Sequence, residues 1–162
     1  MIHFVGIDFE FRESKSGQVE VVCMVAIDLE TDRVYRTWLE GRKPPRPPFP
    51  RLRKTILVAH AVAPAEARCW RALGWKQPAA WIDTYAEARI RACGGRPDGG
   101  FGLLACCRRH GIEAISSDEK ESMRDLVLKG APYSEKEKAK ILDYCETDVR
   151  ETIALFKRLS GG

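Results

Sequence analysis

IHFVGIDF, residues 2–9, is an apolar run rich in β-branched and aromatic side chains, and Glu10 follows it directly. Such a run predicts a buried β-strand. Side chains alternate across a strand, so Asp8 and Glu10 project from one face while Ile7 and Phe9 project from the other. Two carboxylates on one face repel each other and are costly to desolvate, whereas a shared Mg²⁺ or Mn²⁺ would remove both problems. Taken alone, the short Asp-x-Glu pair is better explained as a solvated strand end.

The residues after this strand predict a meander of hairpins. A polar turn at 14–17 leads to a second strand at 19–27, and an acidic turn at 28–32 leads to a third at 34–39. The segment GRKPPRPPFP, residues 41–50, excludes regular structure because its prolines fix φ and remove backbone donors. We interpret it as a surface loop in preference to a recognition motif for a proline-binding partner.

The rest of the chain alternates strands with helices. We expect strands at 55–59 and 80–83, and helices over about 64–73, 84–93, 101–110, 118–129 and 134–159. The last helix has the strongest start signal, because Ser134 and Glu137 form a capping box. Strands first, followed by alternating helices and strands, predict an α/β fold with a mixed five-stranded sheet flanked by helices. A chain of 162 residues suits one domain, residues 1–162.

The last predicted helix carries a second candidate cluster. Within ILDYCETDVRETIALF, residues 141–156, apolar positions recur at helical spacing. Tyr144 and Asp148 are four residues apart and therefore lie on one face of the helix. Asp148 lies beside the apolar stripe, so it is partly buried and needs a partner, which a metal shared with Asp8 would supply. For this helix alone, an ordinary helix-edge aspartate is the alternative.

Together the two clusters resemble the DEDD exonuclease superfamily, in its tyrosine-containing branch. That family carries Asp-x-Glu on its first strand and Tyr-x-x-x-Asp on its last helix, here Asp8-Phe9-Glu10 and Tyr144 to Asp148. The segments LVAHAVAPAEARCWRALGW, WIDTYAEAR and LDYCETDV look most like the proofreading domain of family A DNA polymerases. The resemblance covers nearly the whole chain. It implies a ribonuclease H-like fold and hydrolysis of phosphodiesters with two divalent metal ions, Mg²⁺ or Mn²⁺.

The middle motif departs from the family pattern, which has His-Asn and then an aromatic-Asp pair after the fourth strand. His60 matches the strand end, but no Asn follows it and no Asp lies nearby. Glu66 is the only acid in place, one position later than strict alignment requires. Asp83 is the competitor, and it matches an Asp-Thr pair that is not usually a ligand in these domains. We favour Glu66 as the middle carboxylate and expect His60 to be a packing residue.

The resemblance also implies roles for individual residues. Asp8 would bridge the two ions, Glu10 and Asp148 would complete one metal site, and Glu66 would act on the other. Tyr144 would orient the attacking water, because a phenol with a pKa near 10 is a poor base at neutral pH. Three further residues are candidates for substrate binding: Phe9 and Phe11, which flank the acids, and Arg124. Core packing is the favoured alternative for Phe9, and we expect Trp38, Trp70, Trp75 and Trp81 to be core residues.

The function that follows from the resemblance is 3′→5′ exonuclease activity on single-stranded DNA ends, releasing nucleoside monophosphates. The partners implied are a DNA 3′ end and possible attachment to a polymerase domain or a replication protein. Two alternatives remain: an exoribonuclease like ribonuclease D, acting on RNA, and a weakened module that only binds nucleic acid.

Composition sets the wider context. The net charge is +4, and one stretch holds eight basic residues against the single acid Glu40: Arg33, Arg36, Arg42, Lys43, Arg46, Arg51, Arg53 and Lys54. This stretch is explained equally well by attraction to a phosphate backbone and by a solvated hairpin.

The six cysteines show no zinc spacing, so we expect reduced thiols. With no apolar run long enough to cross a bilayer and no secretion signal, we expect a cytoplasmic protein with no membrane partner.

Overall fold

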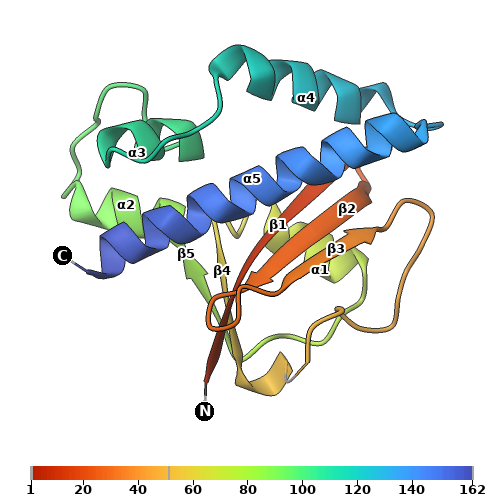
Figure 1. The fold of residues 1–162 in the computed structure, drawn as a ribbon, viewed down its shortest axis with the longest axis horizontal. Helices are drawn as coiled ribbons and strands as arrows, with labels where there is room; N and C mark the ends of the chain where they lie inside the picture. Colours follow the sequence, from red (N-terminus) through yellow and green to blue (C-terminus); the bar gives the residue numbers. More distant parts are fainter. Residues whose placement is uncertain (1, 51, 162) are drawn as a thin grey trace.

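A computed structural model describes residues 2–50 and 52–161 of the chain (Figure 1). Within these residues the strands are β1 (His3–Glu13), β2 (Val19–Asp28), β3 (Val34–Trp38), β4 (Thr55–Ala59) and β5 (Ala80–Asp83). The helices are α1 (Glu66–Ala72), α2 (Thr84–Arg91), α3 (Leu103–Arg109), α4 (Ser117–Lys129) and α5 (Glu135–Ser160), with a 3-10 turn, η1 (Leu52–Lys54).

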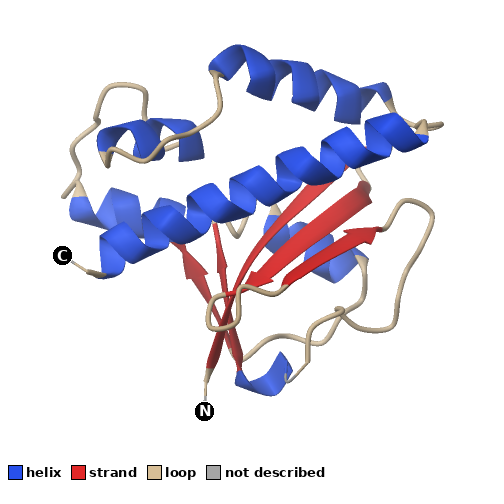
Figure 2. Ribbon diagram, viewed as in Figure 1, coloured by secondary structure: helices blue, strands red, loops and turns tan. Residues whose placement is uncertain are grey.

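The five strands form one mixed sheet in the order β3-β2-β1-β4-β5. β1 pairs antiparallel with β2 and parallel with β4, while β3 is antiparallel to β2 and β5 is parallel to β4. The expected α/β architecture with a mixed five-stranded sheet flanked by helices is therefore confirmed (Figure 2). β1 is longer than the run at 2–9 predicted, and its pairing with β2 shifts register between Glu10 and Phe11.

Helices cover both faces of the sheet. Figure 1 shows α5 crossing one face with α4 beside it, and α1 lies behind the sheet. Buried residues from β1, β2 and β4 pack with Trp70 and Trp75 on the α1 face. On the α5 face, side chains from β2 pack against Ile141, Cys145 and Val149. A third cluster lies between α2, α3 and the end of α5. The sheet thus lies between two apolar layers, which hold the middle of β1, from Val5 to Phe9, in place.

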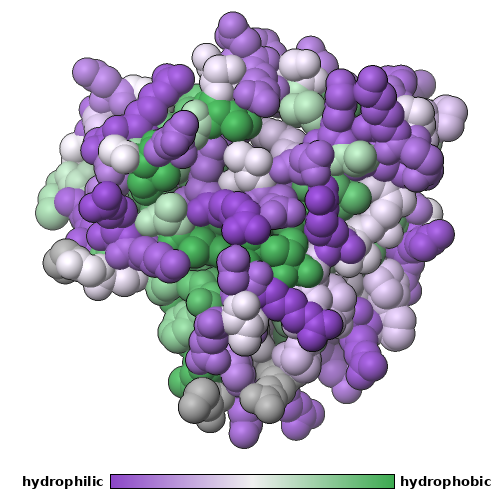
Figure 3. Space-filling view, viewed as in Figure 1, coloured by the Kyte–Doolittle hydropathy of each residue, from purple (hydrophilic) through white to green (hydrophobic). Residues whose placement is uncertain are grey.

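The long helix α5 forms for the reasons that the sequence indicated. Its capping box is present: Ser134 Oγ accepts from the Glu137 amide, and the Glu137 carboxylate accepts from the Ser134 amide. Its apolar stripe is buried from Ile141 to Leu159. The outer surface of this region carries mostly hydrophilic side chains (Figure 3). One face of α5 therefore anchors the helix on the sheet while the opposite face meets solvent.

Trp70 and Trp75 are core residues as expected, whereas Trp38 and Trp81 are partly buried beside the core. Trp70 and Trp75 are buried, and their rings meet edge to face at 4.8 Å. Trp81 packs against Trp70 at 5.5 Å, and Trp38 packs against Tyr133 on the other face of the sheet. All six cysteines are free thiols, and Cys93 is the exposed one.

The segment at 41–50 contains no helix or strand, as its prolines predicted. Arg51, part of the basic stretch, lies outside the described residues. None of the helices in the described part of the chain has the length and hydrophobicity of a membrane-spanning segment.

The close crossing of α5 over β1 generates the first prediction. A Cβ on Gly6 would lie 2.5 Å from Ile153 Cγ1 and 3.2 Å from Val149 Cγ1. Gly6→Ala should therefore overpack this contact and lower the free energy of unfolding by about 1–3 kcal/mol. In an Ile153→Ala background, which removes the two nearest atoms, the same substitution should cost much less. Urea unfolding of the four proteins of this cycle measures the coupling, and additive effects would show that the methyl group does not meet Ile153.

Candidate metal centre

The candidate centre begins on β1, where Asp8 and Glu10 project toward α5. Both side chains are partly buried, and Cys145 of α5 lies against them. The Cys145 thiol donates to Asp8 Oδ2 at 3.3 Å. One ligand atom each from Asp8, Glu10 and Cys145 lie within 4.8 Å of one another. The sheet and the helix therefore bring two carboxylates and a thiol into one small volume.

The chemistry of this set favours oxygen ligands over sulfur. Burial, and then the neighbouring Cys23 thiol and Asp8, raise the pKa of Cys145 well above its usual value. In the metal-free protein the thiol is therefore a protonated hydrogen-bond donor, and Mg²⁺ and Mn²⁺ prefer carboxylate oxygens to sulfur as ligands. Asp8 and Glu10 remain as the metal-ligating candidates of this trio.

Asp148 joins the carboxylates from α5. The residue is 9% exposed, and its Oδ1 atom is buried. Lys120 Nζ lies 3.1 Å from the same atom and forms an ion pair with it. This buried oxygen already faces one cation, so its position suits positive charge.

Glu66 approaches the same place as the first residue of α1. It is only 2% exposed, and Oε2 has no hydrogen-bond partner in the described part of the chain. Burial first, and then the charges of Asp8, Asp83 and Asp148, raise the pKa of Glu66 well above its usual value. The negative charges of Asp8 on β1 and of Asp148 on α5 therefore act on Glu66.

Asp83 has a different environment from Glu66. Its carboxylate accepts the amides of Ala61 at 2.9 Å and Val62 at 3.0 Å, and it caps α2 through the amides of Tyr85 and Ala86. Its oxygens are therefore used to hold the loop between β4 and α1 and the start of α2. Of the two candidates for the middle carboxylate, Glu66 is the one with an oxygen to offer.

Burial has the largest effect on the acids of the centre, and repulsion between carboxylates adds to it for Asp8, Glu10 and Glu66. Burial, followed by the charge of Asp148, raises the pKa of Asp8 to about 8. Burial and then Asp8 raise the pKa of Glu10 well above its usual value, and burial raises that of Asp148. Each shift means that the ionised carboxylate is disfavoured in the metal-free protein. Asp8 and Glu10 cluster with Cys145, and the charges of Asp8 and Asp148 act on the other acids of the centre; anionic oxygen ligands of this kind fit divalent cations.

Tyr144 lies one turn before Asp148 and borders a cleft of about 780 Å³ with Glu10. Burial, and then the charges of Asp148, Glu10 and Asp8, raise the pKa of Tyr144 above its usual value. The side chain is therefore a neutral phenol at physiological pH. A phenol beside carboxylates can hold a water molecule in a fixed orientation, but it is not a base.

The candidate substrate residues have different environments. Phe11 and Arg124 line the same cleft, and Arg124 is exposed. The Phe9 side chain is 4% exposed and packs against Trp70 and Trp75 at ring separations of 6.5 and 6.2 Å. Phe9 is thus a core residue in its packing, and the stacking role suits Phe11 better.

His60 is a packing residue in this structure. Its ring nitrogens hydrogen-bond with Thr84 Oγ1 at 2.9 Å and the Phe101 carbonyl at 3.0 Å. Burial lowers the pKa of His60 to about 4, so the ring is neutral at physiological pH. It ties β4 to α2 and to the loop before α3.

Sequence reasoning missed two charged residues of the centre, Lys120 and Glu151. Lys120 Nζ lies 3.9 Å from Glu151 Oε2 in addition to its ion pair with Asp148. Glu151 is 4% exposed and accepts the Ile115 amide at 3.0 Å. The spacing of Glu151, three residues after Asp148, was the available signal. No local pattern marks Lys120, because α4 carries charged residues on most of its surface.

No model of a known protein family matches this chain, and no curated protein matches it.

The fit of the four carboxylates to divalent cations generates the second prediction. Free Mn²⁺ at about a hundredfold above its Kd should raise the free energy of unfolding by about 2.7 kcal/mol. Asp8→Asn should abolish this increment without destabilising the metal-free protein, because it removes one of several mutually repelling carboxylates. Thermal unfolding with and without Mn²⁺ measures both effects, and Asp125→Asn, an exposed acid on α4, is the matched control. An undiminished Mn²⁺ shift in Asp8→Asn would remove Asp8 from the centre.

Proposed function

We propose that this protein is a metal-dependent 3′→5′ exonuclease that hydrolyses single-stranded DNA ends to nucleoside monophosphates. The observation that carries the proposal is the convergence of Asp8, Glu10, Glu66 and Asp148 from three elements, β1, α1 and α5. Glu66 has a buried oxygen without a hydrogen bond in the described part of the chain, and a buried oxygen of Asp148 faces the Lys120 ammonium. Such a group of acids is unfavourable in isolation and becomes favourable with divalent cations, the ions that phosphodiester hydrolysis requires.

The fold supports this proposal. The order β3-β2-β1-β4-β5, with three antiparallel strands followed by two strands parallel to β1, is compatible with a ribonuclease H-like domain. The acids lie on the central strand of this sheet, on α5 across it and at the start of α1. These are the elements on which the resemblance to the tyrosine-type DEDD exonucleases expects them.

The mechanism assigns separate tasks to the side chains of the centre. Asp8, Glu10 and Asp148 would hold one divalent ion, and Asp8 with Glu66 would hold the second. When bound, the ions lower the pKa of water and stabilise charge on the phosphate and on the leaving 3′ oxygen. Tyr144 hydrogen-bonds the attacking water and aligns it with the scissile bond. Phe11 and Arg124 line the cleft beside Tyr144, where a base and a phosphate of the terminal nucleotide would lie.

The preference for DNA comes from the resemblance to polymerase proofreading domains, and the same centre suits an RNA end equally well. Attachment to a polymerase domain or a replication protein belongs to the same proposal. The atypical middle acid decides between a full exonuclease and a weakened nucleic-acid-binding module. Glu66 reaches farther than an aspartate, and its burial beside the other acids favours the exonuclease.

A direct assay tests the proposal. Purified protein with Mn²⁺ should release mononucleotides from the 3′ end of a single-stranded oligodeoxynucleotide carrying a 5′ label, which yields a ladder of shortened products. Asp8→Asn, purified in the same way, should be inactive, and Asp125→Asn should keep the wild-type rate. An RNA oligonucleotide of the same sequence, run in parallel, decides between the two polynucleotides. Absence of Mn²⁺-dependent products from both would reject the exonuclease and favour the binding module.

The role of Tyr144 generates a separate prediction. Tyr144→Phe removes the hydroxyl and keeps the ring, so the water loses its orientation while the carboxylates stay in place. We expect kcat to fall roughly 10- to 100-fold, the effect of a misaligned reactant. The Mn²⁺-dependent increase in thermal stability should remain. A wild-type rate in Tyr144→Phe would show that another group positions the water.

A further inference from the structure

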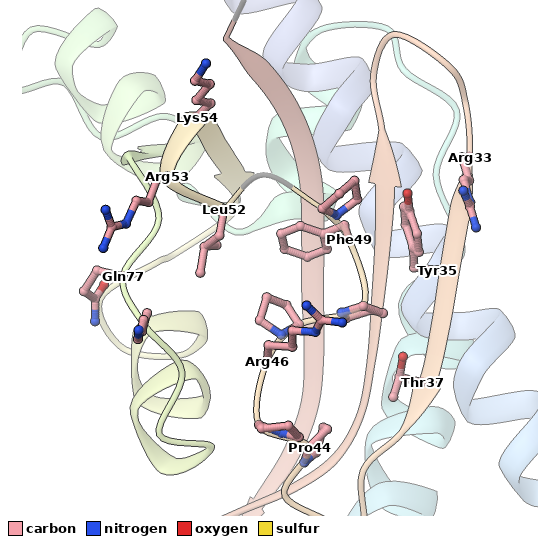
Figure 4. A pocket seen from close by; sticks show the side chains of 15 residues that line it. Arg33, Tyr35, Thr37, Pro44, Arg46, Phe49, Leu52, Arg53, Lys54 and Gln77 are labelled. Carbon is pink, nitrogen blue, oxygen red and sulfur yellow. The ribbon is translucent and has the colours of Figure 1, made fainter.

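A large groove lies on the sheet face opposite the carboxylates. It has a volume of about 1280 Å³ and is formed by β3, the proline loop (residues 41–50), η1 and residues 76–77 (Figure 4). Tyr35 and Thr37 of β3 face it, and Tyr35 packs with the core cluster that includes Ile7 and Phe9. Asp8 and Glu10 project from the other side of the same sheet. The groove is therefore distinct from the candidate metal centre.

The charged side chains that line the groove, among the described residues, are all positive. Its lining includes five exposed cations and, among the described residues, no acid: Arg33, Arg46, Arg53, Lys54 and Lys76. Within the described chain none of these five forms an ion pair with an acid, and Arg33 instead lies 5.0 Å from the ring centre of Tyr35. Five like charges around one hollow repel each other and attract a polyanion.

Arg36, which belongs to the same basic stretch, differs from these five cations because it is paired with acids. Arg36 projects from β3 toward α5, where it pairs with Asp143 and Glu146. The alternation of β3 thus separates a neutralised arginine on the α5 face from the cations of the groove. Four cations of the stretch, Arg33, Arg46, Arg53 and Lys54, therefore remain without an acidic partner at the groove among the described residues.

The walls of the groove are held in place before any ligand binds. Trp75 Nε1 donates to the Pro44 carbonyl at 2.7 Å. Phe49 is 5% exposed and packs between Tyr35 and Trp70 at ring separations of 6.1 and 6.4 Å. Five prolines fix φ along the loop. A ligand that enters this groove therefore loses little affinity to ordering the protein.

We propose that this groove binds the phosphate backbone of a single-stranded nucleic acid, at a site separate from the strand end at the carboxylates. A fixed basic groove with an aromatic ring in its wall matches the way such strands are bound without regard to sequence. The choice of nucleic acid among polyanions rests on the proposed function. The charge and shape of the groove do not depend on it.

Fluorescence anisotropy of a labelled dT20 strand in EDTA tests the groove without cleavage. The double variant R46Q/R53Q should bind roughly tenfold more weakly at 0.1 M salt than the wild type. Its plot of log affinity against log salt should be shallower by about 1.4, because two phosphate contacts are lost from a single strand. R46K/R53K, which keeps both charges, should restore most of the binding. Thermal unfolding checks that each variant folds, which is expected because both arginines are exposed.

A matched control removes two cations outside the groove. K136Q/K140Q changes two exposed lysines at the start of α5 and alters the net charge by the same amount. It should leave dT20 affinity and the salt slope unchanged. Equal losses in the two double variants would overturn the proposal, because binding would then follow net charge alone. Unchanged binding in R46Q/R53Q would overturn it as well.

Competitors distinguish the class of polyanion. Polyglutamate and vesicles containing phosphatidylserine should compete weakly with dT20, and a methylphosphonate strand, which lacks backbone charge, should not bind. If R46Q/R53Q lost binding to polyglutamate or vesicles but kept binding to dT20, the occupant would be an acidic protein or a membrane.

The results that would reject the proposed exonuclease function differ from those that would reject binding of a strand in the groove. Asp8→Asn should bind dT20 in EDTA like the wild type, and R46Q/R53Q should keep the wild-type kcat at saturating substrate. An inactive wild type with groove-dependent binding of dT20 would reject the exonuclease and leave the groove in place.

Discussion

At Gly6 the backbone of β1 lies so close to α5 that a single methyl group there would meet Ile153 at 2.5 Å. This approach determines how far apart the two elements lie at Asp8, two residues farther along the strand. Cys145, two helical turns before Ile153, consequently reaches Asp8 with a hydrogen bond, and Asp148 lies one turn beyond Cys145. The carboxylates of a strand and a helix meet because glycine allows this contact.

The same contact creates an electrostatic cost, which the rest of the fold must offset. Ionised carboxylates are disfavoured in the centre, as the raised pKa values of Asp8, Glu10, Glu66 and Asp148 show. Apolar layers on both faces of the sheet, including Trp70 and Trp75 on one and Val149 on the other, hold the strands and helices together against this repulsion. Lys120 supplies one positive charge from α4. A tethered ammonium satisfies part of the negative charge and leaves room for further cations.

The features that could be predicted from the sequence are those with a local period. Alternation along β1 placed Asp8 and Glu10 on one face, and helical spacing placed Tyr144 beside Asp148. The sheet, the capping box of α5 and the irregular proline loop followed from equally local signals. The extension of β1 to Glu13 was missed, since Phe11, Arg12 and Glu13 do not continue the apolar run.

Features that depend on contacts between distant elements could not be predicted in this way. Lys120 reaches Asp148 only because α4 packs beside α5, and its own helix gives no sign of it. Glu66 was favoured over Asp83 from the sequence, but the physical reason, the hydrogen bonds that hold Asp83 to the β4–α1 loop, depends on contacts between distant segments. Arg36 pairs with an acid, whereas the cations that line the groove form no ion pair among the described residues. This difference likewise depends on which face of β3 packs against α5. Without divalent cations the centre offers a phosphodiester a cluster of acids that already disfavour ionisation, whereas the groove on the other side of the sheet offers exposed cations. The two sites therefore have different requirements: strand-end binding needs divalent cations, and backbone binding in the groove needs only the side chains already present.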